Sequence, residues 1–361
     1  MMAHLAEYGR RKLEGDERAL PVLSYPFSLG YEALVRLRNR SYELGLLDVC
    51  RLPVPVISVG NITLGGTGKT PTVIMLARIM KELGYRPAVI SRGYGGKHDS
   101  PVTIVSDGRL LLSTAEEAGD EPLLIARSLR GVPVLVGRRR VEVGKLALSA
   151  FDVNLLILDD AFQHRRIARD VDILLINGER PFGNGCLLPG GALREPLSSV
   201  RRADMVIVTD GRGWGLENDM ERLAPGTPVF YAERRPRDLV DALTGEILPL
   251  DFLKDKRVAA FAGIAFPARF RDTLAPWCGS IAAFLPFSDH YRYNKKDLAD
   301  LRFAASDADV LVTTEKDGVR LKAGEDLNKR LLLFRIEMCL VPSAEEPVAL
   351  IREMIQKGRT S

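Results

Sequence analysis

The sequence predicts an α/β fold in which a mainly parallel sheet, covered by helices, is followed by a second and smaller α/β domain. From residue 54 onward, short apolar runs alternate with helical patterns. The runs are almost continuous in valine, isoleucine and leucine, as in "VPVISVG" and "VNLLILDD", which is typical of parallel strands buried on both faces. After residue 250 the alternation starts again. Such sheets bind ligands beyond the carboxyl ends of their strands, so the residues after each strand are candidate site residues.

Length and composition are those of an ordinary globular protein. The chain has 361 residues, 46% hydrophobic and 27% charged, which is enough for two domains and shows no sign of general disorder. Fifty-one basic residues against 47 acidic ones give a net charge of +4, which favours acidic partners mildly and does not indicate nucleic-acid binding. The four cysteines lie far apart without a CxxC pair. This argues against a zinc site or disulfide framework and predicts a reducing, cytosolic compartment.

Residues 1–50 predict a segment with an amphipathic helix. No apolar run reaches the roughly 18 residues of a spanning helix, and charges run through residues 7–18, unlike a cleaved signal. In the predicted helix, the apolar side chains that share one face are Phe27, Tyr31, Leu34, Val35 and Tyr42. Arg36 and Arg40 point the other way. This pattern suits a helix in a membrane interface, but taken alone it favours a helix packed on the protein's own core.

The elements of the first domain, residues 51–227, follow one another regularly. The strand "VPVISVG" precedes a helix over residues 70–83, and "PAVIS" precedes the helix "EPLLIARSL". The strand "VPVLVG" and the helix "RVEVGKLALSA" come next, before the strands "VNLLILDD", "DILLIN" and "DMVIVT".

A linker and a second domain complete the chain. In residues 228–250, two extended segments flank Thr244-Gly245, which predicts a hairpin that links the domains as a two-stranded connection. Residues 251–361 repeat the alternation from "RVAAFAGIA" to "RLLLFRIEM" and predict the smaller α/β domain.

The segment "LGGTGKT" directly after the first strand predicts a phosphate-binding loop and thus a P-loop NTPase-like domain. A glycine-rich turn between a strand and a helix directs backbone N–H groups at a phosphate. Lys69 would reach the terminal phosphates and the Thr70 hydroxyl would ligate Mg²⁺. The residues expected to bind the nucleotide here are Gly65, Gly66, Thr67, Gly68, Lys69 and Thr70. The usual spacing asks for glycine where this chain has Thr63.

"LLILDDAFQHRR" is the second part of such a site. An apolar strand ends in Asp159-Asp160, whose carboxylates can hold Mg²⁺ directly or through water, or can form ordinary salt bridges. Gln163 and His164 follow within one turn, so we expect their side chains to face the same pocket.

Further polar groups follow other strands. "VISRGYGG" places Arg92 and Tyr94 after the second strand, and "VPVLVGRRR" places three arginines after another. Of residues 138–140, one arginine is expected to contact phosphate oxygens and two to be surface residues. Asp120 in "GDEP" is either a helix N-cap or a carboxylate that accepts a hydroxyl proton. The loop "LLPGGALREP", with Arg194-Glu195, is of a kind that shapes a site or closes over it.

Taken together, the motifs "GNITLGGTGKTP", "SRGYGG", "GDEP", "LDDAFQHRR", "LLPGGALREP", "FSDHYRY" and "TTEKD" resemble the tetraacyldisaccharide 4'-kinase family of lipid A biosynthesis. They occur in this order from residue 60 to residue 317. The loop of that family also lacks the glycine at the position of Thr63. The resemblance implies transfer of the γ-phosphoryl group of ATP to the 4'-hydroxyl of an acylated glucosamine disaccharide 1-phosphate. It also implies two α/β/α domains with a two-stranded linker, and an N-terminal helix on the cytoplasmic face of the bacterial inner membrane.

The resemblance assigns roles to individual residues. It implies that Asp120 accepts the sugar proton and that His290 holds that carboxylate. The residues expected to organise Mg²⁺ are Thr70, Asp159, Asp160 and Glu195. Those expected to stabilise the moving phosphoryl group or to anchor the acceptor's phosphate are Arg92, Arg140 and Arg194. Closure of the domains about the linker would assemble these groups.

Two other classes stay open at this point. A P-loop ATPase or GTPase could drive a conformational switch or deliver a metal, although Leu64 stands where such loops often have lysine. A nucleotide-binding membrane adaptor would show no turnover at all. The sequence leaves the oligomeric state open, and "TTEKD" has no role in this interpretation beyond a polar strand end.

Overall fold

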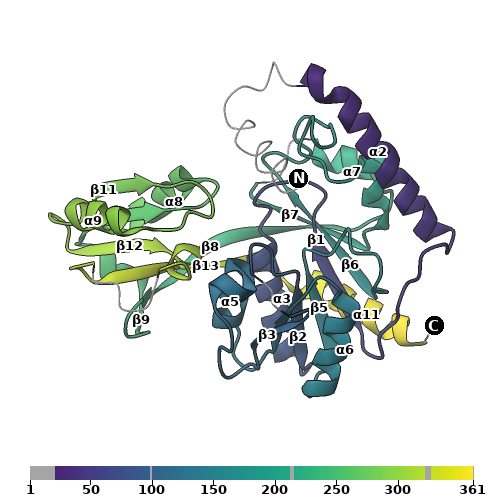
Figure 1. The fold of residues 1–361 in the computed structure, drawn as a ribbon, viewed down its shortest axis with the longest axis horizontal. Helices are drawn as coiled ribbons and strands as arrows, with labels where there is room; N and C mark the ends of the chain where they lie inside the picture. Colours follow the sequence, from purple (N-terminus) through teal and green to yellow (C-terminus); the bar gives the residue numbers. More distant parts are fainter. Residues whose placement is uncertain (1–20, 98–99, 212–214, 322–326, 361) are drawn as a thin grey trace. The chain divides into compact units, whose positions relative to one another are not determined.

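The computed structural model describes residues 21–97, 100–211, 215–321 and 327–360 (Figure 1). The chain forms two compact units that interleave in sequence. The first unit comprises the described parts of residues 1–92, 139–233 and 340–361, and the second comprises those of residues 93–138 and 234–339. Both units are α/β and mainly parallel, which confirms the predicted fold class.

The first unit contains a parallel sheet with the strand order β8-β7-β6-β1-β5-β2. Its strands are β1 (Val56–Gly60), β2 (Pro87–Ser91), β5 (Leu155–Asp159), β6 (Val171–Asn177), β7 (Met205–Thr209) and the beginning of β8 (Val229–Asp241). Every residue of β1, β2, β5 and β7 is buried. This is the reason that these strands read as continuous apolar runs rather than as alternating ones.

Helices cover this sheet (Figure 1). They are α2 (Pro21–Glu43), α3 (Lys69–Glu82), α6 (Arg140–Ala150), the 3₁₀ helix η1 (Leu197–Arg202), α7 (Leu216–Leu223) and α11 (Glu345–Thr360). Helix α3 packs against β1, β2 and β5, and α11 packs against β6. A core cluster that includes Ile62, Phe162 and Leu174 also buries side chains of α7, and Tyr31 of α2 packs against it.

The second unit contains the part of the sheet with the strand order β11-β10-β12-β13-β8. Its strands are β10 (Arg257–Ala262), β11 (Ser280–Pro286), β12 (Val310–Thr314), β13 (Leu331–Val341) and the later part of β8. Its later helices are η2 (Leu250–Leu253), α8 (Pro267–Leu274), η3 (Ala275–Trp277), α9 (Lys295–Ala304) and α10 (Glu315–Gly318). An earlier segment adds β3 (Thr103–Ser106), α4 (Ala115–Ala118), α5 (Asp120–Ser128) and β4 (Val134–Val136). Because α5 packs against α10, this earlier segment brings Asp120 into the second unit.

Residues 228–250, which the sequence analysis assigns to a hairpin linker, contain an antiparallel strand pair. Leu239 and Val240 of β8 pair antiparallel with β9 (Ile247–Leu248), and Gly245 in the turn has a φ of +73°. The hairpin turn and β9 lie within the second unit. The two strands that begin in one unit and end in the other are β8 and β13.

Helix α2 presents two different sides. Ser28, Val35 and Asn39 are buried, whereas the side chains of Phe27 and Leu34 are 71% and 68% exposed. The prediction of one common apolar face is therefore wrong for these side chains, because Val35 turns toward the core while Phe27 and Leu34 turn outward. One side of α2 packs on the protein, and the other is apolar and open to solvent. Among the described helices, none combines the length and hydropathy needed to cross a membrane.

Gly60 is the last residue of β1, and the backbone of the segment after β5 passes very close to it. A Cβ atom at this position would lie 2.6 Å from both the amide nitrogen and the Cβ of Phe162. Only glycine allows β1 and the residues after β5 to approach in this way. This approach holds together the two strand ends that the site is built on.

We expect Gly60→Ala to lower the free energy of unfolding by about 1 to 3 kcal/mol, because the added methyl group overpacks a rigid backbone contact. Urea denaturation measures the change. The matched control is Gly30→Ala in α2, where a Cβ meets nothing within 4 Å and where alanine stabilises a helix by up to about 1 kcal/mol. Equal effects of both substitutions would contradict the close approach at Gly60.

Candidate active site

The segment after β1 has the geometry of an anion-binding loop. Gly65 and Gly68 have φ angles of +113° and +78°, which side-chain-bearing residues rarely adopt. A Cβ at Gly65 or Gly66 would meet nothing within 4 Å, so this part of the loop is open. Helix α3 begins at Lys69 with Gly68 as its N-cap and no side-chain capping bond. Its first N–H groups are therefore directed toward the loop, where a phosphate would accept them.

Asn61 braces this loop from inside. It is fully buried, and its Nδ2 donates to the carbonyl oxygen of Thr63 at 2.7 Å and to Oγ1 of Thr67 at 2.9 Å. Its Oδ1 accepts from Nζ of Lys69 at 3.3 Å. Sequence reasoning missed Asn61, although a polar residue directly after a buried strand is a signal that could have identified it.

Thr63, which stands where the usual motif has glycine, pairs with a residue of another loop. Thr63 forms an antiparallel bridge with Leu193 of the "LLPGGALREP" loop. Leu64 N donates to the carbonyl of Ala192, and Arg194 N donates to the carbonyl of Ile62, both at 2.7 Å. A residue in an extended bridge needs no glycine. The same pairing places the "LLPGGALREP" loop beside the phosphate loop.

Asp160 gathers the cations of the site. Nζ of Lys69 lies 3.7 Å from Oδ1 of Asp160, and Nη1 of Arg194 donates to both carboxylate oxygens at 2.9 and 3.0 Å. Burial alone would raise the pKa of Asp160, but the charges of Lys69 and Arg194 outweigh it and hold that pKa far below its usual range. The φ of Asp160 is +47°, a strained value for this residue type. Such strain is typical of functional positions.

Arg140 supports the same strand end from below the surface. It is 4% exposed, and its Nη2 donates to the carbonyl oxygens of Asp159 at 3.0 Å and of Asp160 at 3.2 Å. The carboxylate of Asp159 accepts from Oγ of Ser91 at 2.8 Å. Arg138 and Arg139 are exposed, as expected for two of the three arginines, and the expectation that Arg140 contacts phosphate oxygens stays a prediction.

The remaining predicted nucleotide residues are placed differently. Nε2 of Gln163 donates to the carbonyl of Asn61 at 2.9 Å, so Gln163 lies against the loop. Burial and the nearby charge of Arg140 lower the pKa of His164 to about 3, so this imidazole is neutral near pH 7. Arg92 is exposed in the first unit, and Tyr94 is 69% exposed in the second.

Glu195 has a different set of partners from the one predicted. Its carboxylate is fully buried, and it accepts from Nδ2 of Asn39 at 2.9 Å and from Nη2 of Arg38 at 3.3 Å, both on α2. Nη2 of Arg202 completes the set at 3.0 Å. Arg202 and Asn39 lower the pKa of Glu195 although burial would raise it. These contacts connect Glu195 to α2 and to Arg202, and the metal-binding role that the resemblance implies for Glu195 stays a prediction.

The oxygen atoms near the loop are suitable ligands for a Mg²⁺ ion of the kind found in phosphate-transferring sites. Asp159 at the end of β5 pairs in register with Val59 of β1, so both aspartates follow the strand next to the phosphate loop. Thr70 lies in the first turn of α3 and is half-buried. In the described part of the chain, no group of three or more His, Cys, Asp or Glu residues could hold a metal ion on its own. This donor set suits an ion that shares its coordination with substrate phosphates.

A second polar cluster lies in the other unit and surrounds Asp120. Nδ1 of His290 lies 3.2 Å from Oδ2 of Asp120, and Nε of Arg320 donates to the same oxygen at 2.7 Å. The N-cap of α5 is Gly119, and Asp120 is the first helical residue. The capping alternative for Asp120 is therefore wrong, because its carboxylate bonds His290 and Arg320.

Both ring nitrogens of His290 have charged neighbours. Nζ of Lys316 lies 3.2 Å from Nε2, and Nδ1 lies 3.2 Å from Oδ2 of Asp120 and 3.3 Å from Nη2 of Arg320. His290 has a φ of +59°, another strained value. Asp120 and His290 belong to one compact unit, whereas Lys69 and Asp160 belong to the other.

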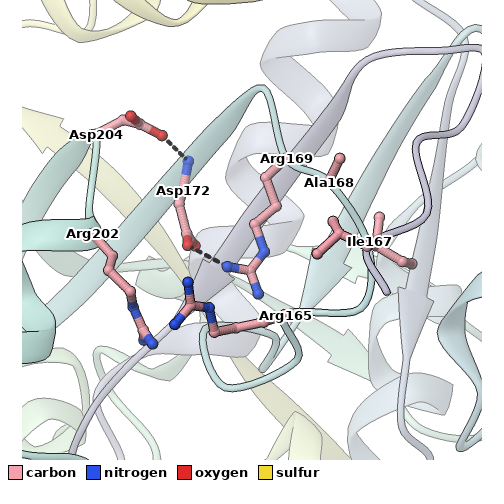
Figure 2. A pocket seen from close by; sticks show the side chains of 8 residues that line it. Arg165, Ile167, Ala168, Arg169, Asp172, Arg202 and Asp204 are labelled. Carbon is pink, nitrogen blue, oxygen red and sulfur yellow. Dashed lines mark hydrogen bonds and ion pairs between the residues drawn. The ribbon is translucent and has the colours of Figure 1, made fainter. Parts of the chain in front are cut away.

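A cavity of ≈260 Å³ in the first unit lies away from these residues (Figure 2). It is lined by Val49, Arg165, Ile167, Ala168, Arg169, Asp172, Arg202 and Asp204. Asp172 and Asp204 stand at the starts of β6 and β7, whereas the phosphate loop follows the end of the parallel strand β1. Burial raises the pKa of Asp172 to about 6, and Nη1 of Arg169 donates to it at 2.7 Å. None of the predicted site residues lines this cavity.

The chain was compared with known protein families and curated proteins. A family model described as tetraacyldisaccharide-1-P 4'-kinase matches residues 20–356. A protein named tetraacyldisaccharide 4'-kinase from Syntrophus aciditrophicus is 45% identical, covering 95% of this chain and 95% of that protein. A protein with the same name from Geobacter sulfurreducens is 47% identical over 84% of each chain.

A solved structure is also similar. It is described as a crystal structure of the "apo" form of LpxK from Aquifex aeolicus in complex with ATP. The TM-score is 0.75 at 34% sequence identity, and the match covers 93% of this chain and 100% of that one.

We expect Glu195→Gln to lower the free energy of unfolding by about 3 kcal/mol or more, because Arg38 and Arg202 would lose the anion of a buried ion pair. Helix α2 should then be cut faster by trypsin at its arginines, which limited proteolysis followed by mass spectrometry can measure.

The matched control is Asp219→Asn, which removes an exposed ion pair with Arg222 in the same unit. It should change stability by less than about 1 kcal/mol. If Glu195→Gln left the stability and the trypsin cleavage of α2 unchanged, the holding role of Glu195 would be wrong.

Proposed function

The chain belongs to the tetraacyldisaccharide-1-P 4'-kinase family, and from that premise we propose how its residues perform the reaction. The chain catalyses the ATP-dependent phosphorylation of the 4'-hydroxyl of an acylated glucosamine disaccharide 1-phosphate, in lipid A biosynthesis. The observation that carries the assignment of residues is that each chemical task has its own cluster. Lys69, Arg194 and Asp160 surround the phosphate loop, and an ionised carboxylate with a histidine partner lies in the second unit.

On the donor side, the phosphate loop holds the phosphates of ATP. Residues 65–70 supply backbone N–H groups, and Lys69 binds the terminal phosphates. Thr70, Asp159 and Asp160 would hold Mg²⁺, which when bound neutralises charge on the phosphates. Arg194 stabilises the charge of the moving phosphoryl group, since its guanidinium already lies beside Lys69 on Asp160. Arg140 holds the backbone of both aspartates in place.

On the acceptor side, Asp120 takes the proton of the sugar 4'-hydroxyl. The sugar oxygen bonds to the γ-phosphorus as the bond from that phosphorus to the bridging oxygen of ADP breaks, and the proton passes to the Asp120 carboxylate. His290 orients the carboxylate through its Nδ1 atom. Closure of the domains, which the family resemblance implies, would exclude water during the transfer. Arg92 and Tyr94 then serve to hold substrate from the loop after β2.

Helix α2 supports a location at the cytoplasmic face of the inner membrane. The acceptor carries acyl chains, so its hydroxyl is presented at a lipid surface. The outward side of α2 carries Phe27, Leu34 and Leu37, which are 71%, 68% and 65% exposed. Arg36 and Arg40 are exposed on the same helix and suit anionic lipid head groups.

The assignment is tested by incubating the protein with labelled ATP, with and without the acylated disaccharide 1-phosphate. We expect label in the lipid product only when the acceptor is present. Acceptor-independent release of phosphate would favour a switch ATPase, and the absence of both products would favour an adaptor. Either result would refute the proposed roles.

We expect Asp120→Asn to lower kcat by about 10²- to 10⁴-fold, because the amide cannot accept the hydroxyl proton. Binding of ATP, measured by calorimetry, should be unchanged, since Asp120 belongs to the acceptor side. Lys69→Ala is the contrasting variant, which should weaken ATP binding as well as turnover. A near-normal kcat in Asp120→Asn would remove Asp120 from the chemistry.

We expect replacement of Phe27, Leu34 and Leu37 by glutamine to reduce binding to anionic phospholipid vesicles at least tenfold, because each side chain loses more than about 1.4 kcal/mol of transfer free energy. Vesicle co-sedimentation measures this, and the unfolding free energy should not change. Leu243→Gln, at an 85% exposed position of the second unit, is the control that should bind as the wild type does. Unchanged sedimentation of the triple variant would contradict the membrane role of α2.

A further inference from the structure

Arg320 lies beside Asp120 although it is not part of any motif discussed above. Its side chain is 3% exposed. Nε donates to Oδ2 of Asp120 at 2.7 Å, and Nη1 donates to the carbonyl of Gly263 at 2.7 Å. A guanidinium that is buried and bound at two points of its planar fork has one orientation. Arg320 therefore offers Asp120 a fixed donor.

The "TTEKD" segment fixes Arg320 from its other side. Asp317 is fully buried, and its Oδ1 accepts from Nη1 of Arg320 at 3.1 Å, from the hydroxyl of Tyr293 at 2.9 Å and from the amide of Gly263 at 3.1 Å. Its Oδ2 accepts from Oγ1 of Thr314 at 2.6 Å. Thr314 is itself the N-cap of α10. The motif thus builds a rigid, hydrogen-bonded support directly behind Arg320.

We propose that Arg320, held by Asp317, is a positioning residue that fixes the Asp120 carboxylate for the reaction. The inference rests on the proposed function, because Asp120 is the proton acceptor there. It adds a second holding group to His290, and it gives the "TTEKD" segment a role. The two donors both contact Oδ2 of Asp120. Oδ1 takes part in neither contact and is the oxygen that we assign to the acceptor's proton.

The charges around Asp120 favour its ionised form. His290 and Arg320 contact it directly, and Lys316 lies 3.5 Å from both Glu121 and Asp289 in the same cluster. Burial would raise the pKa of Asp120, but the hydrogen bond from His290 and the charge of Arg320 lower it to about 2. Because the folded-state pKa is depressed, this interaction stabilises the protein above about pH 4, and the contribution is lost as the pH falls toward 2.

A carboxylate with so low a pKa is a weak base, and the reaction tolerates this. Phosphoryl transfer passes through a loose transition state in which the attacking oxygen has formed little of its new bond. The hydroxyl proton is then lost late, and the position of the acceptor contributes more than its basicity. Arg320 therefore fixes the position of the Asp120 carboxylate while it lowers the basicity of that carboxylate.

The test compares wild type, Arg320→Ala and Arg320→Lys, each as the full chain. Steady-state kinetics against pH give kcat and KM, and ¹³C NMR of labelled aspartate follows the Asp120 carboxyl, assigned by its absence in Asp120→Asn. For Arg320→Ala we expect kcat to fall about 10- to 100-fold with an unchanged KM for ATP, as for a misplaced catalytic group. The NMR midpoint of Asp120 and the acid limb of kcat should rise to about pH 4 or above. For Arg320→Lys we expect a kcat and an Asp120 midpoint between those of the wild type and Arg320→Ala, since lysine keeps the positive charge but lacks the planar guanidinium fork.

Arg271→Ala is the control, because Arg271 is 51% exposed in the same unit and pairs with Asp272. It should behave as wild type. If both Arg320 variants kept the wild-type midpoint of Asp120, or lost activity only in proportion to unfolded protein, the positioning role would be overturned. If Arg320→Ala does not fold, the kcat and the Asp120 midpoint of Arg320→Lys test the proposal instead. A wild type without acceptor-dependent transfer would refute the proposed function, whereas the NMR titration would still decide whether Arg320 holds Asp120.

Discussion

The donor side of this kinase depends on how one carboxylate shares two cations. Lys69 and Arg194 come from distant parts of the chain, and both pair with Asp160. Without that anion they would repel each other in a partly buried place. Asp160 is in turn fixed through its backbone, where Arg140 binds its carbonyl and the chain adopts a left-handed conformation. In the proposed function, the phosphates of ATP would offer Lys69 and Arg194 new anionic partners, and Asp160 would keep the two cations together until the nucleotide binds.

The same loop that delivers Arg194 also connects this site to helix α2. The Thr63–Leu193 bridge ties the "LLPGGALREP" loop to the phosphate loop. One residue further on, the hydroxyl of Tyr31 donates to the carbonyl of Arg194 at 2.9 Å, and Asn39 binds Glu195. Helix α2 thus supports the backbone of Arg194, the residue that we propose stabilises the moving phosphoryl group. The outward apolar side of α2 and its inward polar side serve different tasks on one helix.

The parts of the site that could be predicted from sequence are those encoded by neighbouring residues. A strand, a glycine turn, Lys-Thr and a helix form one continuous segment, and Asp159-Asp160 end a recognisable strand. Contacts across the chain could not be derived this way. Asp120 and Arg320 are 200 positions apart, and Asn39 and Glu195 are 156 apart. The contacts of Glu195 with Arg38, Asn39 and Arg202 could not be foreseen, because the sequence of a loop motif does not show which distant side chains its carboxylate meets. His290 was connected with Asp120 only through the family resemblance.

The buried carboxylate of Glu195 would also affect how the enzyme moves on the lipid surface to which we propose that α2 binds. Its charge is balanced partly from α2 and partly from Arg202, so the helix cannot peel away without exposing an unsatisfied ion pair. A helix held in this way cannot rotate relative to the rest of its unit. If α2 lies on a bilayer, as we propose, the nucleotide-binding unit would keep a fixed orientation on the membrane, and it would meet the acceptor by diffusion in two dimensions.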